Sequence, residues 1–60
     1  MYENAQYQKD REGNVVCIMF NRDGATYFCP LDPSNIDYAN LMELEREGKI
    51  VIQPADGEQQ

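Results

Sequence analysis

Two short segments of the sequence have the same form, a turn that leads into an apolar run. The letters DREG at residues 10–13 precede such a run at residues 14–20, and NRDG at residues 21–24 precede another at residues 25–29. Asp or Asn in the first place and Gly in the fourth suit a type I turn that closes a three-residue hairpin loop with a bulge. With a further strand at about residues 3–9, the pattern predicts a three-stranded antiparallel β-meander.

The register of the meander decides which side chains share a face. Three-residue loops at both turns place Cys17 opposite Cys29 and next to Tyr7, and they place Ile18 opposite Phe28. An alternative is a two-residue type I′ turn at positions 23 and 24, which would put the two cysteines on opposite faces. In both registers the central strand is apolar on both sides, so both faces need a cover.

With three-residue loops, the two faces of the sheet have different apolar content. One face carries Ala5, Tyr7, Val15, Cys17, Met19, Tyr27, Cys29 and Leu31. The other carries Val16, Ile18, Phe20, Phe28 and Pro30, with Asn4, Gln6, Gln8 and Thr26 at its side. We expect the first face, which has more apolar residues, to be covered by the rest of the chain.

A helix is predicted after the meander. Asp32 before Pro33 fits an N-cap with proline in the first helical position, and a capping box from Ser34 to Asp37 is the alternative. The helix should end near residue 47, because Gly48 follows. Its apolar stripe is Tyr38, Leu41, Met42 and Leu44.

The last part of the chain is expected to be short and extended. Residues 49–53 form a short C-terminal strand or an extended tail, and proline ends it at position 54. Residues 55–60 are predicted to be a polar tail. The chain of 60 residues is therefore expected to be one small α+β domain, spanning residues 1–54.

Composition argues against several functions. The net charge is -6 with a pI near 4.2, which disfavours nucleic acid and anionic membranes as partners. The chain has no histidine, the commonest general base and metal ligand, so we expect no enzyme activity, no cofactor and no metal site. The first residues lack a signal segment, which predicts synthesis in the cytoplasm, where the two cysteines would be reduced, buried thiols.

The second half of the chain resembles a type of small protein encoded by tailed bacteriophages, among them marine and cyanobacterial phages. The matching segments are Asp23-Gly24-Ala25, then Pro30, Asp32, Pro33, Asn35, Asp37 and Tyr38, then Glu47-Gly48, and finally Pro54-Ala55-Asp56. The resemblance implies a phage origin and a structural or tail-region gene product. It implies no catalytic residue.

Two functions are compatible with these observations. The first is a virion-associated structural or assembly protein of the capsid or tail, which binds phage proteins or itself through the uncovered sheet face. The predicted partner-binding residues are Val16, Ile18, Phe20, Thr26 and Phe28. The second is a small acidic inhibitor of a host enzyme that mimics nucleic-acid phosphates. Its predicted acidic face consists of Asp37, Glu43, Glu45 and Glu47. The apolar surplus on the strands favours the first function.

Overall fold

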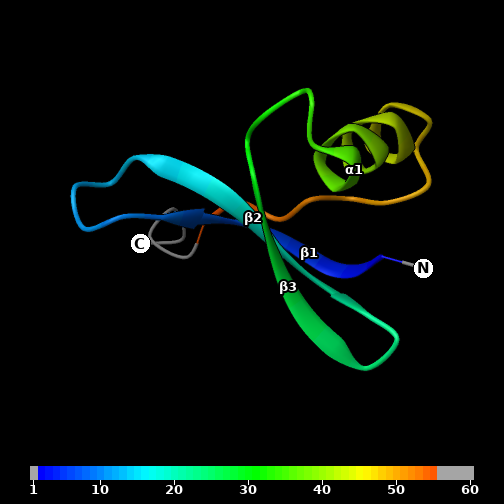
Figure 1. Cartoon of the computed structure of the whole chain (residues 1–60), viewed down its shortest axis with the longest axis horizontal. Coiled ribbons are helices and arrows are strands. Elements are labelled where there is room, and N and C mark those ends of the chain that lie inside the picture. Colours follow the sequence, from blue (N-terminus) through cyan, green and yellow to red (C-terminus); the bar gives the residue numbers. More distant parts are fainter. Residues whose placement is uncertain (1, 56–60) are drawn as a thin grey trace.

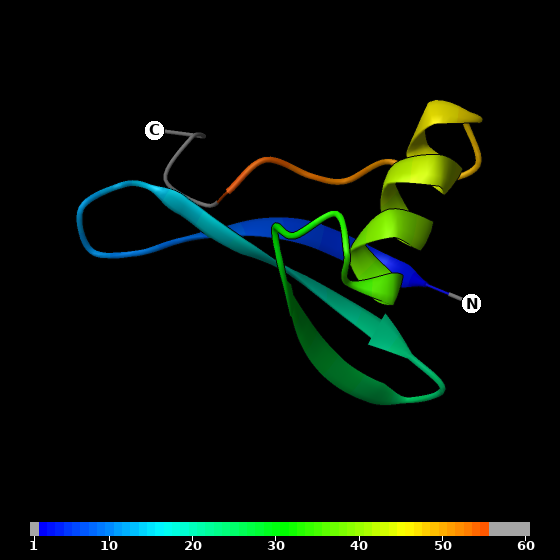
Figure 2. The same ribbon diagram turned by 45° about the horizontal axis from the view of Figure 1, so that its top comes forward.

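The chain folds as a three-stranded antiparallel sheet followed by one helix. The computed structural model describes residues 2–55. Its elements are β1 (Glu3–Lys9), β2 (Val15–Arg22), β3 (Ala25–Pro30) and α1 (Ile36–Arg46), and the strand order is β1-β2-β3. The helix lies across one face of the twisted sheet, as Figures 1 and 2 show from two directions. The predicted α+β meander with one helix is confirmed.

The first hairpin has the predicted three-residue loop. The backbone N–H of Asp10 donates to the carbonyl of Asn14 at 2.9 Å, and that of Gly13 donates to the carbonyl of Asp10 at 3.1 Å. The Asp10 carboxylate also accepts from the backbone N–H groups of Asn14 and Glu12, at 3.0 and 2.9 Å. These hydrogen bonds, that of Asn14 first, hold the pKa of Asp10 below its ordinary value.

The second hairpin has a two-residue turn, so the predicted three-residue loop is wrong there and the type I′ alternative is right. Arg22 pairs with Ala25, and both residues between them have positive φ, +54° at Asp23 and +82° at Gly24. Asp-Gly suits this turn, because glycine adopts positive φ without steric cost and aspartate tolerates it. The type I′ turn also matches the twist of the strands it joins.

The register of β1 on β2 changes by one residue after the first turn. Lys9 pairs with Val15 but Gln8 pairs with Cys17, so Val16 is an extra residue in β2. Compared with the predicted register, this bulge exchanges the two faces of β2 relative to β1, and the shorter second turn exchanges them relative to β3. Ile18 therefore pairs with Tyr7 on one side and with Cys29 on the other, where Cys17 was expected.

The hydrophobic core lies between α1 and the sheet face that carries Ile18 and Phe20. The buried residues of this core are Ala5, Ile18, Phe20, Cys29, Leu41 and Ile52, and those packed against them are Tyr2, Tyr7, Tyr38, Met42 and Ile50. The expectation that Ile18 and Phe20 lie on the face left uncovered is wrong. Because β2 is inverted, its two largest apolar side chains, Ile18 and Phe20, face the helix. Cys17, which was expected on the covered face, points away from the helix.

The helix begins later than the sequence suggested. Asn35 is the N-cap, and its side-chain oxygen accepts from the backbone N–H of Tyr38 at 3.0 Å. Asp32, the predicted cap, accepts instead from the backbone N–H and hydroxyl of Ser34, at 3.0 and 2.8 Å, and so orders the turn before the helix. The predicted cap at Asp32 and the alternative at Ser34 are both wrong, because this local turn uses the Asp32 carboxylate.

The helix ends as predicted. Glu47 is the C-cap and Gly48 follows with a φ of +77°. The backbone N–H of Gly48 donates to Glu45 at 3.0 Å, and that of Lys49 donates to Leu44 at 2.9 Å. This pair of hydrogen bonds is a Schellman motif, which needs a left-handed residue at the position of Gly48.

The chain after the helix returns to the sheet beside β1. The N–H of Tyr7 donates to the carbonyl of Gln53 at 3.0 Å, and the N–H of Gln53 donates to the carbonyl of Ala5 at 2.9 Å. This is a single parallel bridge, so the segment is extended rather than a full strand. It buries Ile52, and it also buries Ala55, the first residue of the predicted tail. Residues 56–60 of that tail lie outside the described residues.

Candidate interaction surface

The sheet face opposite the helix has an apolar centre. We call it the outer face, and the strand register arranges it in three cross-strand rows. These rows are Glu3, Asn21 and Thr26, then Gln6, Met19 and Phe28, and finally Gln8, Cys17 and Pro30. In the second and third rows, apolar side chains occupy β2 and β3, and glutamines occupy β1. The helix, which supplies the other layer, lies on the opposite side of the sheet (Figure 2).

Phe28 is the most exposed large residue of the outer face. Its side chain is 65% exposed, while its row neighbours Met19 and Gln6 are half-buried. A phenylalanine ring is worth about 1.5–3 kcal/mol when fully buried, so covering the exposed part of Phe28 would contribute about 1–2 kcal/mol. Among the residues of this face, Phe28 is thus the one whose burial by a partner would contribute most to binding.

The structure divides the five predicted partner-binding residues among three environments. Ile18 and Phe20 are fully buried under the helix, so they do not belong to a surface. Val16 is 46% exposed at the bulge of β2. Only Thr26 and Phe28 lie on the outer face, and both are exposed. The five therefore do not share a face, because β2 is inverted relative to the predicted register and turns Ile18 and Phe20 towards the helix.

Sequence reasoning missed Cys17 and Met19 as members of the outer face, whereas Pro30 had been placed on the same face as Phe28, where the structure has it. Met19 and Cys17 are half-buried there, beside exposed Pro30. The available signal was the dipeptide Asp23-Gly24, which is typical of a two-residue hairpin turn. With that turn, the outer-face residues of β3 would have been assigned correctly relative to β2.

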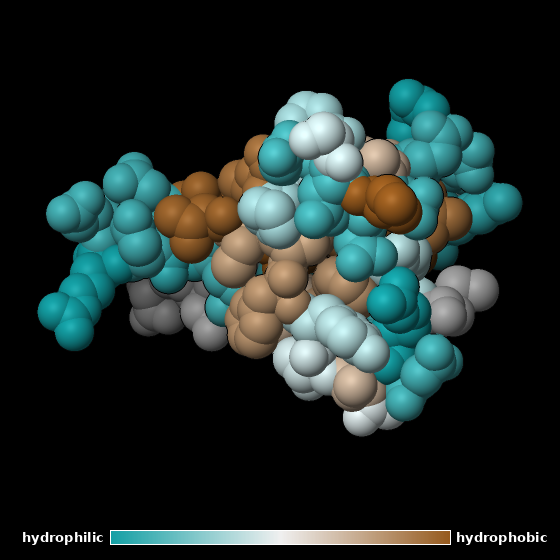
Figure 3. Space-filling model, in the orientation of Figure 1, coloured by the Kyte–Doolittle hydropathy of each residue, from teal (hydrophilic) through white to brown (hydrophobic). Residues whose placement is uncertain are grey.

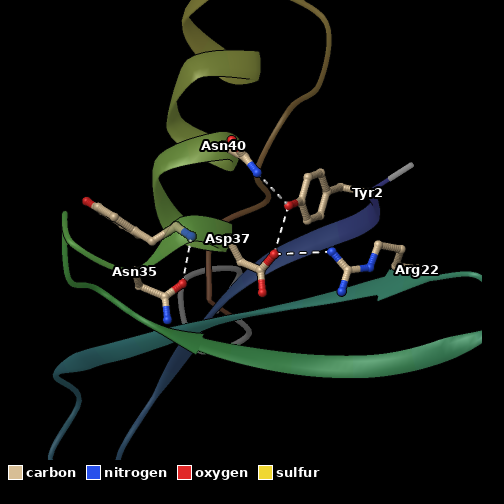
Figure 4. Close-up of polar contacts among 6 residues, drawn as sticks. Tyr2, Arg22, Asn35, Asp37 and Asn40 are labelled. Carbon is tan, nitrogen blue, oxygen red and sulfur yellow. Dashed lines mark hydrogen bonds and ion pairs between the residues drawn. The ribbon is translucent and has the colours of Figure 1, made fainter.

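A polar cluster joins the N-terminus, the end of β2 and the first turn of α1 (Figure 4). Asp37 accepts from the hydroxyl of Tyr2 at 2.8 Å and from the guanidinium of Arg22 at 3.2 Å. The amide of Asn40 in turn donates to the Tyr2 hydroxyl at 3.2 Å. The carboxylate of Asp37, which is part of the predicted acidic face, is therefore bonded to other residues of the same chain.

Aromatic rings surround the cation of this cluster. The Arg22 guanidinium carbon lies 4.9 Å from the ring centroid of Tyr27, 5.6 Å from that of Tyr2 and 5.8 Å from that of Phe20. These distances fall within the range of cation–π attraction. Together with the ion pair to Asp37, these ring contacts make the Arg22 side chain a link between the sheet and the helix. The sequence analysis assigned no role to Arg22.

The other residues of the predicted acidic face also do not form one row. Glu43 forms an ion pair with Arg46, and Glu47 lies 3.4 Å from the ammonium of Lys49. Glu45 projects from the other side of the helix, because two residues correspond to just over half a turn. Burial raises the pKa of the Tyr7 hydroxyl, and the negative charge of Glu45 adds to this effect.

The two cysteines lie in different environments. Cys17 is half-buried on the outer face, whereas Cys29 is 2% exposed in the core. Burial raises the pKa of the Cys29 thiol, and the nearby Asp37 carboxylate adds to this effect. Because the residues lie on opposite faces, the predicted cross-strand pair Cys17–Cys29 is wrong.

Residues 2–55 present surfaces rather than a recess. No pocket is found in this part of the chain, and no group of three or more metal-ligating side chains is found there. The single described helix is too short and too polar to cross a membrane. The outer face, with exposed Phe28 beside Met19, is the candidate functional site.

Comparison with known proteins gives no relative of this chain. No protein-family model matches it, and neither a curated protein nor a solved structure matches it.

Proposed function

We propose that this chain is a non-enzymatic phage protein that acts by binding other proteins through the outer face, as a virion-associated component or assembly factor of the capsid or tail. The observation that carries the proposal is Phe28, a large apolar side chain that is 65% exposed beside Met19. Exposed apolar side chains that cluster on one face are typical of protein–protein contacts. The resemblance to small phage proteins supports the virion as the setting.

The size of the expected effect follows from Phe28. Its burial contributes about 1–2 kcal/mol, which corresponds to about a 5- to 30-fold change in affinity. A charged residue at this position should cost more, because a carboxylate would be buried without a partner. Phe28→Asp is therefore the variant with the largest expected effect on binding. The folded monomer should tolerate it, since the side chain lies mostly in solvent.

The experiment is quantitative mass spectrometry of purified virions of the encoding phage, with the wild-type gene and two variants. Ile36→Asp is the matched control, because Ile36 is 76% exposed on the helix, on the opposite side of the sheet. We expect the chain in wild-type and Ile36→Asp virions and a clear reduction with Phe28→Asp. Absence of the wild-type chain from virions, together with its recovery on a host enzyme, would favour the acidic inhibitor and refute the virion role.

A further inference from the structure

We propose that the free edge of β3 pairs in antiparallel orientation with β3 of a second copy of this chain, to form a two-fold symmetric dimer with one continuous sheet. The proposal rests on the proposed function, protein–protein binding, and deepens it by naming one partner. It concerns the strand edge, whereas the virion role concerns the outer face. Each can therefore fail without the other.

The two edges of the sheet differ in how they are protected. The β1 edge is bridged by Gln53, interrupted by two register shifts, and carries the charged residues Glu3 and Lys9. Bulges, charges and a covering segment are the usual devices that keep an edge strand from pairing with another chain. Among residues 2–55, β3 pairs with β2 alone, and its sequence ATYFCP contains no charged residue. The β3 edge therefore lacks these devices, apart from its terminal Pro30.

The backbone of β3 is complementary to a copy of itself. In a hairpin with a two-residue turn, the residues that flank the turn form a hydrogen-bonded pair, and such pairs alternate along the ladder. Arg22 pairs with Ala25 in this way, so the N–H and C=O groups of Thr26 and Phe28 point to the free edge. A two-fold axis at Tyr27 places Thr26 of each copy opposite Phe28 of the other and pairs all of these groups.

Pro30 agrees with this alternation. It lies two residues beyond Phe28, so the position of its missing N–H also faces the free edge, where proline is tolerated in a strand. Pairing of two copies would thus end at Cys29. Pro30 has no N–H group, so no donor is left without an acceptor at that position.

Aromatic side chains stand on both sides of the same edge. Phe28 is 65% exposed on the outer face, and Tyr27 is 39% exposed on the helix side, where it stacks on Phe20 at 5.5 Å. In the dimer Tyr27 would lie directly opposite Tyr27 of the second copy, and the two Phe28 side chains would be diagonal neighbours, which aromatic rings are long enough to bridge. Figure 3 shows tan and pale, near-neutral atoms over the middle of the molecule, where β3 runs, and mostly teal residues towards the left and right ends of the molecule.

Charge restricts where two copies can meet. Each chain carries a net charge of -6, so copies repel one another overall. A two-fold axis brings only the residues that lie close to it near their own equivalents, so a charge near the axis would meet a like charge. β3 itself has no charged residue, and the Arg22 guanidinium beside Tyr27 forms an ion pair with Asp37. The remaining repulsion is long-range, so added salt should strengthen the dimer.

The test is sedimentation equilibrium of the purified wild-type chain, Thr26→Lys and Gln8→Lys over a wide range of concentration and salt. Both variants add a lysine to the outer face and remove one unit of net negative charge, but only Thr26 lies on the β3 edge. We expect a wild-type dimer that strengthens with salt, a dissociation constant raised about tenfold or more in Thr26→Lys, and little change in Gln8→Lys.

Amide hydrogen exchange gives an independent readout. The N–H groups of Thr26 and Phe28 should exchange slowly at high concentration and faster on dilution, while the paired N–H of Tyr27 stays protected throughout. A wild-type chain that is monomeric at every concentration would overturn the proposal. A dimer weakened by Gln8→Lys but not by Thr26→Lys would overturn it too, because the contact would then be the outer face and not the edge. The virion experiment is unaffected by either result.

Discussion

Replacement of Leu41 by alanine should remove a large part of the stability of this domain. Leu41 is the one described helix residue that is fully buried, and it packs among Ile18, Phe20 and Cys29. A buried leucine replaced by alanine costs about 2–5 kcal/mol, the transfer term together with the cavity left behind. A domain of 60 residues has a free energy of unfolding of about 3–9 kcal/mol in total. The single substitution therefore removes about half of it.

The helix should be affected together with the core. α1 has 11 residues, and isolated helices shorter than about 12–15 residues are marginal in water. Its presence thus depends on docking through Leu41, with Tyr38 and Met42 beside it. We expect Leu41→Ala to lower both the helical signal in circular dichroism and the urea midpoint. With a denaturant slope of about 1 kcal/mol per molar urea, the midpoint should fall by about 2 M or more.

Two further variants make the result interpretable. Leu44→Ala is the matched control on the same helix, because Leu44 is half-buried and lies outside the core cluster. It should cost less than about 1 kcal/mol. Leu41→Met conserves volume and should remain folded at a cost below about 1.5 kcal/mol, so the midpoint can be measured even if Leu41→Ala is unfolded. Equal effects of Leu41→Ala and Leu44→Ala would refute the proposed docking of the helix.

Three other predictions concern the caps, the first turn and the thiols. Asn35→Ala should destabilise the fold by about 0.5–2 kcal/mol in urea unfolding, whereas Ser34→Ala should cost less than about 0.5 kcal/mol, because Asn35 is the N-cap; the reverse order would contradict this. The folded pKa of Asp10 is lowered, so its contribution to stability is complete at neutral pH and is lost as pH falls below about 4. Asp10→Asn, which keeps an acceptor that does not titrate, should flatten the dependence of the urea midpoint on pH in that range, and an unchanged slope would count against the turn geometry. Cys17 should react with a thiol reagent at least about tenfold faster than Cys29, which is buried with a raised pKa; similar rates, followed by mass spectrometry, would show that the core opens easily.

The sequence by itself determined the features that depend on neighbouring residues. The two turns could be located because Gly13 and Gly24 follow Asp or Asn at turn spacing, and the run after each glycine is rich in apolar, β-branched or aromatic residues. The end of the helix could be located because Gly48 supplies the left-handed conformation of its C-cap. The start of the helix could not, since Asp32, Ser34 and Asn35 are all good caps and only one of them can act.

The tertiary structure alone decided which face of the sheet the helix covers. β2 is apolar on both sides, so its pattern does not distinguish one face from the other, and a shift of one residue exchanges them. The choice came from two local events that the sequence left open, the extra residue Val16 and the short turn at Asp23 and Gly24. Together they place Ile18 and Phe20 against Leu41 and leave Phe28 in solvent, because large side chains gain most where a second layer can close over them.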